Sequence, residues 1–270
     1  MNNYMSRSIS QSMDRLPALS GMVKALSDAE HLGRYNAGLW SAHLPLSLLW
    51  TGRGTARRMV PYRAPSWSWF FLEMLREPYP TGLPSTDKAY ATVHEVECTV
   101  SGQDPYGAVS SGRLRPTAPL LQIEQSRTGS PDTKALPNVH DDGKPSYARK
   151  PGVSYKPKDY NFGKLHSFNK FDFQLDIPAD EPLFRLLLGG GGKIHWHGLV
   201  PTALEHMPQR VEGLILRRHD DHGVDVHDQV FKRVGSFELY DSGYAYKDHD
   251  ACFQLLKALD GRENRTVTIV

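Results

Sequence analysis

Two histidines one residue apart, His195 and His197, are the first pair in this chain whose spacing could do chemistry. On a β-strand, side chains two positions apart point to the same face, so the two imidazoles could share a metal ion. A third ligand would come from the polar turn HDDHGVDVHD, which begins at His219. Because the chain holds twelve histidines, such a pair is also expected without any metal, and the turn is typical of a solvent-exposed hairpin. We therefore predict no bound metal or other cofactor, and keep His195 and His197 as the candidate ligands.

A run of four glycines at residues 189–192, followed by Lys193, resembles a phosphate-binding loop only superficially. Such a loop needs a glycine five residues before its Gly-Lys pair and a serine or threonine after the lysine. Leu187 and Ile194 occupy those two positions, and no helical pattern follows. The run is interpreted as a flexible turn between two strands.

The sequence offers no nucleophile with a base beside it. The segment GAVSSG (residues 107–112) has its serines displaced from the positions that a GxSxG nucleophile elbow requires. Cys98 lies in a strand-like apolar segment, where thiols are usually inert. Glu95 and Glu97 share a strand face, an arrangement that is usually solvated. These observations favour a chain that is not an enzyme.

Aromatic side chains gather in residues 34–69, which read RYNAGLW…LPLSLLW…YRAPSWSW. They could line a ligand groove or a partner interface. Tryptophans bury large areas and carry a single polar group, so we expect a packed core instead. Arg63 could stack its guanidinium on one of the rings. The aromatic residues in question are Trp40, Trp50, Tyr62, Trp67 and Trp69.

The first third of the chain is expected to be helical before it becomes extended. Helical spacing of leucines and valine predicts a helix over residues 14–30, with Pro17 in its first turn and Gly33 ending the pattern. AGLW and LPLSLLW are short and apolar, which favours packed helical turns. YRAPSWSWFF returns to aromatic alternation and predicts a strand that begins near Pro65.

From residue 88 onward the pattern has period two and predicts strands. Pro116 and Pro119 would place the strand RLRPTAPLLQIE at a sheet edge. Residues 125–165 are rich in Pro, Ser, Gly and charged residues and predict a flexible insertion. Further strands are expected at FNKFDFQLDI, LFRLLL, KIHWHGLV, VEGLILRR, QVFKRVGSFELY and RTVTIV, the fourth and fifth forming a hairpin, with a helix at DACFQLLKAL.

The predicted fold class is therefore α+β: a short helical N-terminal segment packed on a mainly antiparallel β-sheet or partly open barrel. Residues 1–12 are expected to be disordered, and residues 13–270 to form one domain. The net charge of +2 is too small to indicate nucleic acid or an anionic membrane surface. Cys98 and Cys252 fit no zinc or disulfide pattern, and no apolar run resembles a signal peptide or membrane span. A cytoplasmic location is expected.

Several of these segments together resemble a known family. DRLPALSG, YNAGLW, LPLSLLW and YRAPSWSW, followed in order by ECTVSGQDPYGAVSSGRLRPTAPLL, VEGLILRR, FKRVGSFELY and RTVTIV, are similar to the region downstream of the HET domain in fungal heterokaryon-incompatibility proteins. The resemblance covers most of the chain except residues 125–165 and the glycine run. The signature residues that carry it are Tyr35, Gly38, Leu39, Trp40, Leu49, Trp50, Tyr62, Arg63, Ala64, Pro65, Ser66, Trp67, Ser68 and Trp69.

The resemblance implies an ascomycete protein linked to non-self recognition and programmed cell death. The HET domain, which lies upstream in this family, is absent from the sequence, so we expect a truncated member whose remaining part is a non-catalytic regulatory or recognition region. Its implied partner is a HET effector domain in cis or in trans. The alternative is a small-molecule or metal-binding β-barrel protein, possibly enzymatic, that uses the His195/His197 face. The same sequence would also fit a stand-alone protein that closes its own core.

Overall fold

The computed structural model describes residues 4, 9–50, 56–74, 88–125, 155–157, 166–171, 181–191, 210–219, 229–240 and 264–270. The chain begins with the 3₁₀ turns η1 (Ser12–Arg15) and η2 (Pro17–Leu19), which lead into the helix α2 (Ser20–Leu26). The helix predicted over residues 14–30 is thus confirmed in place, but only its middle is α-helical. Pro17 occupies the first turn of η2, where its missing N–H costs no hydrogen bond. Gly33 follows in the left-handed region, with a φ of 68°.

A two-stranded hairpin follows the helical segment. After η3 (Glu30–Leu32), strands β1 (Tyr35–Asn36) and β2 (Leu39–Trp40) pair antiparallel. The turn between them needs positive φ at two successive residues, 42° at Ala37 and 99° at Gly38. Helical turns were therefore wrong for AGLW. They are confirmed for LPLSLLW (residues 44–50), which contains η5 (Leu46–Leu48) and follows directly after η4 (Ser41–His43).

The segment YRAPSWSWFF does not form the predicted strand. A short hairpin of β3 (Ala56–Arg58) and β4 (Leu72–Met74) brackets it, and its only regular element is the 3₁₀ turn η6 (Trp69–Phe71). An alternating strand exposes every second residue, but Ser66, Trp67, Ser68 and Trp69 are all buried. Residues 66–69 are instead packed against other parts of the chain on both faces.

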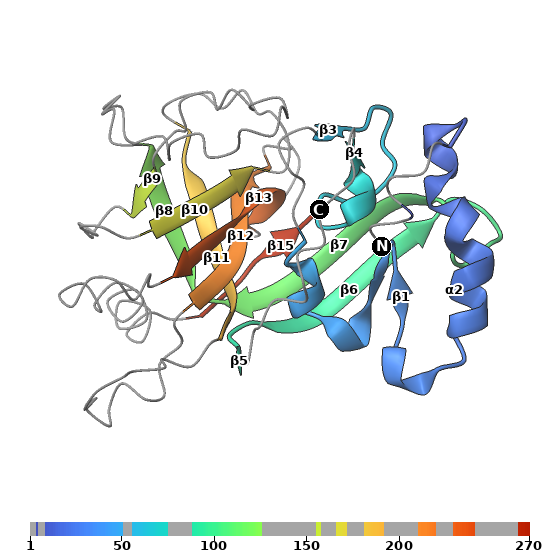
Figure 1. Ribbon diagram of the computed structural model, residues 1–270, viewed down its shortest axis with the longest axis horizontal. Helices are drawn as coiled ribbons and strands as arrows, with labels where there is room; N and C mark the ends of the chain where they lie inside the picture. The colour runs from blue at the N-terminus through green and yellow to red at the C-terminus, as the bar shows by residue number, and fades with distance from the viewer. Residues whose placement is uncertain are drawn as a thin grey trace, which may run out of the picture.

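The remaining strands form one eleven-stranded sheet, whose pairings are antiparallel except between β13 and β15. Its hydrogen-bonded order is β14-β7-β15-β13-β12-β11-β8-β9, with β5, β6 and β10 beside this path. In Figure 1 the long strands β6 and β7 run toward the helical segment, β8 and β10–β13 gather at the opposite end, and β15 lies between the two groups. The strands are β5 (Lys88–Ala89), β6 (Thr92–Val100), β7 (Val109–Ala118), β8 (Leu120–Gln125), β9 (Tyr155–Pro157), β10 (His166–Phe171), β11 (Leu183–Gly191), β12 (Arg210–Arg218), β13 (Val230–Tyr240), β14 (Arg265–Thr266) and β15 (Thr268–Ile269).

Strand β7 is not the edge strand that its prolines predict. It pairs with β6 on one side and with β14 and β15 on the other. Pro116 lies opposite Val93, where β6 contains a register shift between Val93 and Glu95. On the other side the Pro116 carbonyl accepts from the amide of Val267. An irregularity in the partner strand thus accommodates the missing N–H of proline within the sheet interior.

The glycine run also belongs to a strand, and the turn predicted there is wrong. Residues 189–191 continue β11 and pair with Arg210, Val211 and Glu212 of β12, as well as with β5. The predicted pairing of VEGLILRR with QVFKRVGSFELY is confirmed, because β12 and β13 lie antiparallel over nine residue pairs.

Several predicted segments lie outside the described residues. They are KIHWHGLV, DACFQLLKAL and most of residues 125–165, of which only Gln125 at the end of β8 and Tyr155–Pro157 in strand β9 are described. Of residues 1–12, Tyr4 is described as helical, and its ring makes edge contacts with Trp69 and Phe70.

One hydrophobic core joins the helical segment to the sheet. Its buried members include Leu16 of the helical segment. They also come from the segment YRAPSWSWFF (Trp67, Phe70), from β7 (Leu114) and from β11 and β13 (Leu186, Phe231). The α+β class and the mainly antiparallel sheet are therefore confirmed. Within the described part of the chain, no helix is long and apolar enough to cross a membrane.

The same substitution at two glycines should have opposite effects on stability. A Cβ added at Gly213 of β12 would lie 2.0 Å from the main-chain oxygen of Leu186, so Gly213→Ala must displace strand β11. We expect a loss of more than about 2 kcal/mol in unfolding free energy. Gly21 in α2 has no atom within 4 Å of an added Cβ, and Gly21→Ala should gain about 0.5–1 kcal/mol. Urea denaturation measures both, and a Gly213→Ala protein as stable as the parent would contradict the strand packing described here.

Candidate functional site

Arg63, in the middle of the signature, is buried and holds three segments together. Its guanidinium donates to the carbonyl oxygens of Phe70 (2.7 Å), Leu72 (2.7 Å) and Ser12 (2.8 Å). Burial lowers the pKa of this group to about 10, which leaves it protonated at neutral pH. Because these three hydrogen bonds end on main-chain oxygens, the guanidinium links η1, η6 and β4.

Ser68 and Trp69 of the signature fix the β1–β2 hairpin. The Ser68 hydroxyl donates to the carbonyl of Ala37 at 2.5 Å and accepts the amide of Phe70 at 3.1 Å, capping η6. The indole N–H of Trp69 donates to the carbonyl of Gly38 at 2.9 Å. These two hydrogen bonds end on Ala37 and Gly38, the two residues of the β1–β2 turn that have positive φ. The signature thereby stabilises a turn whose first residue, an alanine, is disfavoured in the left-handed region.

A second buried arginine, Arg233 of β13, meets the signature at Ser66. The Ser66 hydroxyl accepts the amide of Arg233 at 2.9 Å and donates to the main-chain oxygen of Val270. The Arg233 guanidinium donates to the carbonyls of Leu48 and Trp50 and lies 3.3 Å from the centre of the Trp50 ring. We call Ser66, Arg233, Trp50 and Val270 the Ser66 junction. It ties Leu48, Trp50 and Ser66, which lie outside the sheet, to strand β13 and to Val270 at the end of β15.

The aromatic cluster is therefore mainly core, as its composition predicts. Trp50, Trp67 and Trp69 are buried and Trp40 is half-buried, whereas Tyr62 is 43 % exposed. The prediction that Arg63 stacks on an aromatic ring is wrong. Arg63 donates to carbonyl oxygens, and a different arginine, Arg233, stacks on the Trp50 ring. The other signature residues Tyr35, Leu39, Leu49, Ala64 and Pro65 are buried or half-buried.

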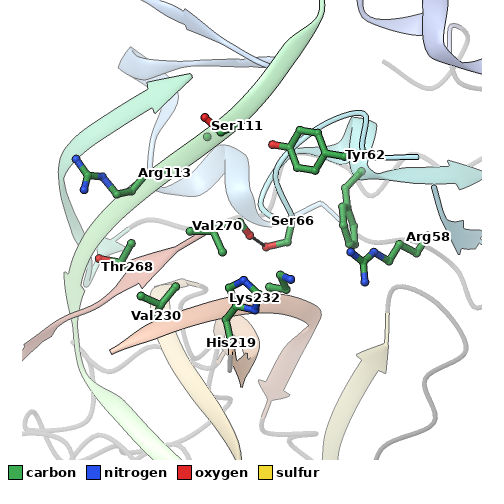
Figure 2. A pocket seen from close by; sticks show the side chains of 12 residues that line it. Arg58, Tyr62, Ser66, Ser111, Arg113, His219, Val230, Lys232, Thr268 and Val270 are labelled. Carbon is green, nitrogen blue, oxygen red and sulfur yellow. Dashed lines mark hydrogen bonds between the residues drawn. The ribbon is translucent and has the colours of Figure 1, made fainter. Parts of the chain in front are cut away.

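A cavity of about 460 Å³ opens above the Ser66 junction and is the candidate functional site. Its size is within the range of small-molecule pockets. Figure 2 shows the hydrogen-bonded pair of Ser66 and Val270 near its centre, with His219 and Lys232 below and Tyr62 above. It is lined by Arg58, Tyr62, Ser66, Phe71, Ser111, Gly112, Arg113, His219, Val230, Lys232, Thr268 and Val270.

The lining of the cavity carries positive charge. Arg58, Arg113 and Lys232 come from three separate strands, β3, β7 and β13, and the lining contains no Asp or Glu side chain within the residues that the structure describes. Arg113 is engaged by Glu95 (3.2 Å) and Glu97 (3.3 Å) on the face of β6, and Figure 2 shows it directed away from Lys232 and Arg58. The guanidinium of Arg58 lies 5.5 Å from the centre of the Phe71 ring.

The candidate chemical residues from the sequence analysis lie in different parts of the structure, and some of them are not described. His195 and His197 lie outside the described residues, so their metal site stays a prediction. His219, the first residue of the polar turn that could supply a third ligand, lines the cavity, and no group of three potential ligand side chains occurs in the described ranges. Glu95 and Glu97 form the expected exposed charged face, paired with Arg113.

Cys98 is half-buried on β6, and burial raises the pKa of its thiol to about 12. Ser110 and Ser111, the displaced serines, bond to Thr99 on the neighbouring strand rather than to a base. No activated nucleophile is therefore formed by these three residues.

Sequence reasoning missed the cationic cavity. Arg58 ends the basic sequence TGRGTARR (residues 51–58), but Lys232 and Arg113 are ordinary strand residues, and nothing in the local sequence relates the three. Their meeting depends on β15 filling the space between β7 and β13, a pairing of only a few residues.

No family model, curated protein or solved structure matches this chain. The resemblance to the region downstream of HET domains is thus neither supported nor contradicted by these comparisons.

The Ser66 junction should contribute strongly to stability. Arg233→Lys keeps the charge but loses the ring stacking and the planar pair of donors, leaving carbonyls of Leu48 and Trp50 unsatisfied. We expect a loss of about 3 kcal/mol in unfolding free energy. Arg113→Lys, on an exposed ion pair, should cost less than about 0.5 kcal/mol. Equal effects in chemical denaturation would show that the buried arginine has no special role.

Cys98 should resist alkylation in the folded protein. The thiolate is the reactive form, so a pKa near 12 leaves almost none of it at pH 8.5. Iodoacetamide followed by peptide mass spectrometry should leave Cys98 unmodified under native conditions and modified in guanidinium chloride. Rapid native modification at pH 8.5 would mean that the thiol is neither buried nor shifted as described.

Proposed function

We propose that this chain is the non-catalytic regulatory or recognition region of a HET-type protein linked to fungal non-self recognition and cell death. One observation supports the proposal: five side chains of the signature are used for hydrogen bonds inside the protein. Arg63, Ser66 and Ser68 direct their side chains at main-chain groups, and so do the indoles of Trp50 and Trp69. These five side chains act as a scaffold, because their hydrogen bonds hold the main chain in place.

A scaffold with this role needs a surface on which the effector domain can dock. Met22 and Leu26 lie four residues apart on α2, so they share one face of the helix, and they are 62 % and 47 % exposed. Exposed apolar side chains that adjoin one another are typical of protein contact sites. We assign the contact with the HET effector domain to this face.

The alternative function, small-molecule binding, is favoured by one observation. The cavity above the Ser66 junction has the volume of a ligand site and includes His219, the first residue of the polar turn. The metal-binding part of that alternative rests on His195 and His197, which lie outside the described residues.

The proposal predicts binding without turnover. The purified chain, mixed with a separately purified HET domain from a family protein, should form a complex with a Kd in the micromolar range by calorimetry. The double substitution Met22→Ser/Leu26→Ser should weaken it more than about tenfold, since each buried aliphatic side chain is worth roughly 1.5 kcal/mol or more. Val60→Ser, at an apolar residue that is also exposed, is the matched control and should have little effect.

Two outcomes would contradict this function. Consumption of NAD by the chain alone would show that it is an enzyme. The absence of any complex at protein concentrations of about 100 μM, with both partners folded by circular dichroism, would remove the regulatory role, because a weaker interaction is not a specific one.

A further inference from the structure

Strand β6 has one edge that no described strand occupies. It pairs with β7 along one side, and within the described part of the chain no ladder forms along its other side. Strand β1 lies near β6 in Figure 1, but it pairs with β2 instead. The edge of a strand without a partner is a template to which another extended chain can add.

The main-chain groups on this edge belong to Val96 and Cys98. Residues of an antiparallel strand direct their N–H and C=O groups alternately to the two sides. On β7 the Pro116 carbonyl accepts from the segment between β14 and β15, on the side away from β6. Arg113 is an odd number of residues from Pro116, so its main chain faces β6, and that of its partner Glu97 faces β7. The two neighbours of Glu97 in β6 therefore face the free edge.

The inner face of β6 is only partly covered along the same edge. On β7 the inward residues Leu114 and Ala118 are buried. On β6 the inward residues Val96, Cys98 and Val100 are only half-buried, although the first two pack against the core. A further strand with apolar side chains on this face would remove the remaining apolar surface from water, which favours its addition.

The outer face determines which charge an added strand should carry. Arg113 of β7 pairs there with Glu95 (3.2 Å) and Glu97 (3.3 Å) of β6, so basic and acidic side chains alternate from one strand to the next. The Glu97 side chain is 58 % exposed and bonds Arg113 through its Oε2 atom. On the free side, the two glutamates lie at non-hydrogen-bonded positions, where opposed side chains approach most closely. Lys or Arg on the next strand would continue the alternation.

We propose that the free edge of β6 binds an extended segment of a partner protein by strand addition, with Lys or Arg opposite the two glutamates and apolar residues opposite Val96 and Cys98. A second copy of β6 is a poorer occupant, because its outer row contains no Lys or Arg. The site is independent of the docking face on α2, so either proposal can fail without the other.

The peptide Ac-TVKVKVT-NH2 is the probe for this edge. At about 20 mM salt it should bind the full chain with a Kd of about 100 μM or tighter by protein-observed NMR. Ac-TVEVEVT-NH2 reverses the charge and Ac-TVKKVVT-NH2 breaks the alternation, so each should bind at least about tenfold more weakly. Raising the salt to about 200 mM should weaken the binding of the probe.

Methylation of the peptide amides tests the ladder without changing the protein. In the proposed register the valines direct their main-chain groups at β6 and the lysines direct theirs away. An N-methyl group on the central valine should therefore abolish detectable binding, whereas one on either lysine should change the Kd less than about threefold. Equal effects at the two positions would show that the peptide does not add as a strand.

Hydrogen exchange locates the bound peptide. In the free protein the amides of Val96 and Cys98 should exchange faster than that of Glu97, which faces β7. The probe should slow exchange at Val96 and Cys98 and leave Glu97 unchanged, because only the first two gain hydrogen-bond acceptors.

Charge variants test the choice of partner. Glu97→Lys should weaken binding of the probe about tenfold or more, because it places like charges opposite each other. Asp28→Lys is the matched control, with the same change of charge at an exposed residue beyond α2, and should change the Kd less than about twofold. Circular dichroism should show that both variants fold, since both sites are exposed.

Three results would overturn the proposal. They are no binding of the probe to the folded parent protein, equal losses in Glu97→Lys and Asp28→Lys, and slow exchange at Val96 and Cys98 before any peptide is added. The last result, if light scattering also shows a dimer, would assign the edge to a second copy of the chain.

Discussion

The burial of one positive charge, the guanidinium of Arg233, constrains how this fold is assembled. Arg233 is 1 % exposed, and burying a guanidinium is costly unless its donors are satisfied. The carbonyls of Leu48 and Trp50 and the face of the Trp50 ring supply that compensation. These groups lie in a segment with little regular structure. The segment must therefore take up one conformation against β13, and the hydroxyl of Ser66 fixes the same place by bonding both Arg233 and Val270.

Arg63 repeats this solution at the other end of the signature. Irregular main chain that is buried needs partners for carbonyl groups that would pair with one another in a helix or a sheet. Arg63 satisfies three such carbonyls, and Trp50, Ser68 and Trp69 satisfy others in Trp67, Ala37 and Gly38. This explains why one short segment contains so many side-chain donors. Residues 63–68 are buried without forming a helix or a strand, because side chains supply the hydrogen bonds that a helix or a sheet would otherwise supply.

The elements that sequence predicts well are those in which local pattern and burial agree. Strands β12 and β13 were found where expected, and the half-buried face of Val96, Cys98 and Val100 follows the period-two rule. The signature broke the rule because residues on both of its sides are buried. The edge position predicted from Pro116 was wrong because the irregularity that accommodates this proline lies in the partner strand β6, next to Val93. The cationic cavity could not be predicted from the sequence, because Arg58 and Lys232 come together only through pairing between distant parts of the chain.

The Ser66 junction and the cavity share two residues, so side chains that stabilise the fold lie next to side chains that line the cavity. The floor of the cavity is formed by Ser66 and Val270, two members of the junction. Arg58 and Lys232 lie on its walls, and Arg58 is exposed. A change at the floor disturbs folding, whereas a change at Arg58 alters charge at little cost in stability. The charge of the cavity can therefore change while the scaffold is kept, because the side chains that set the charge are separate from those that hold the floor.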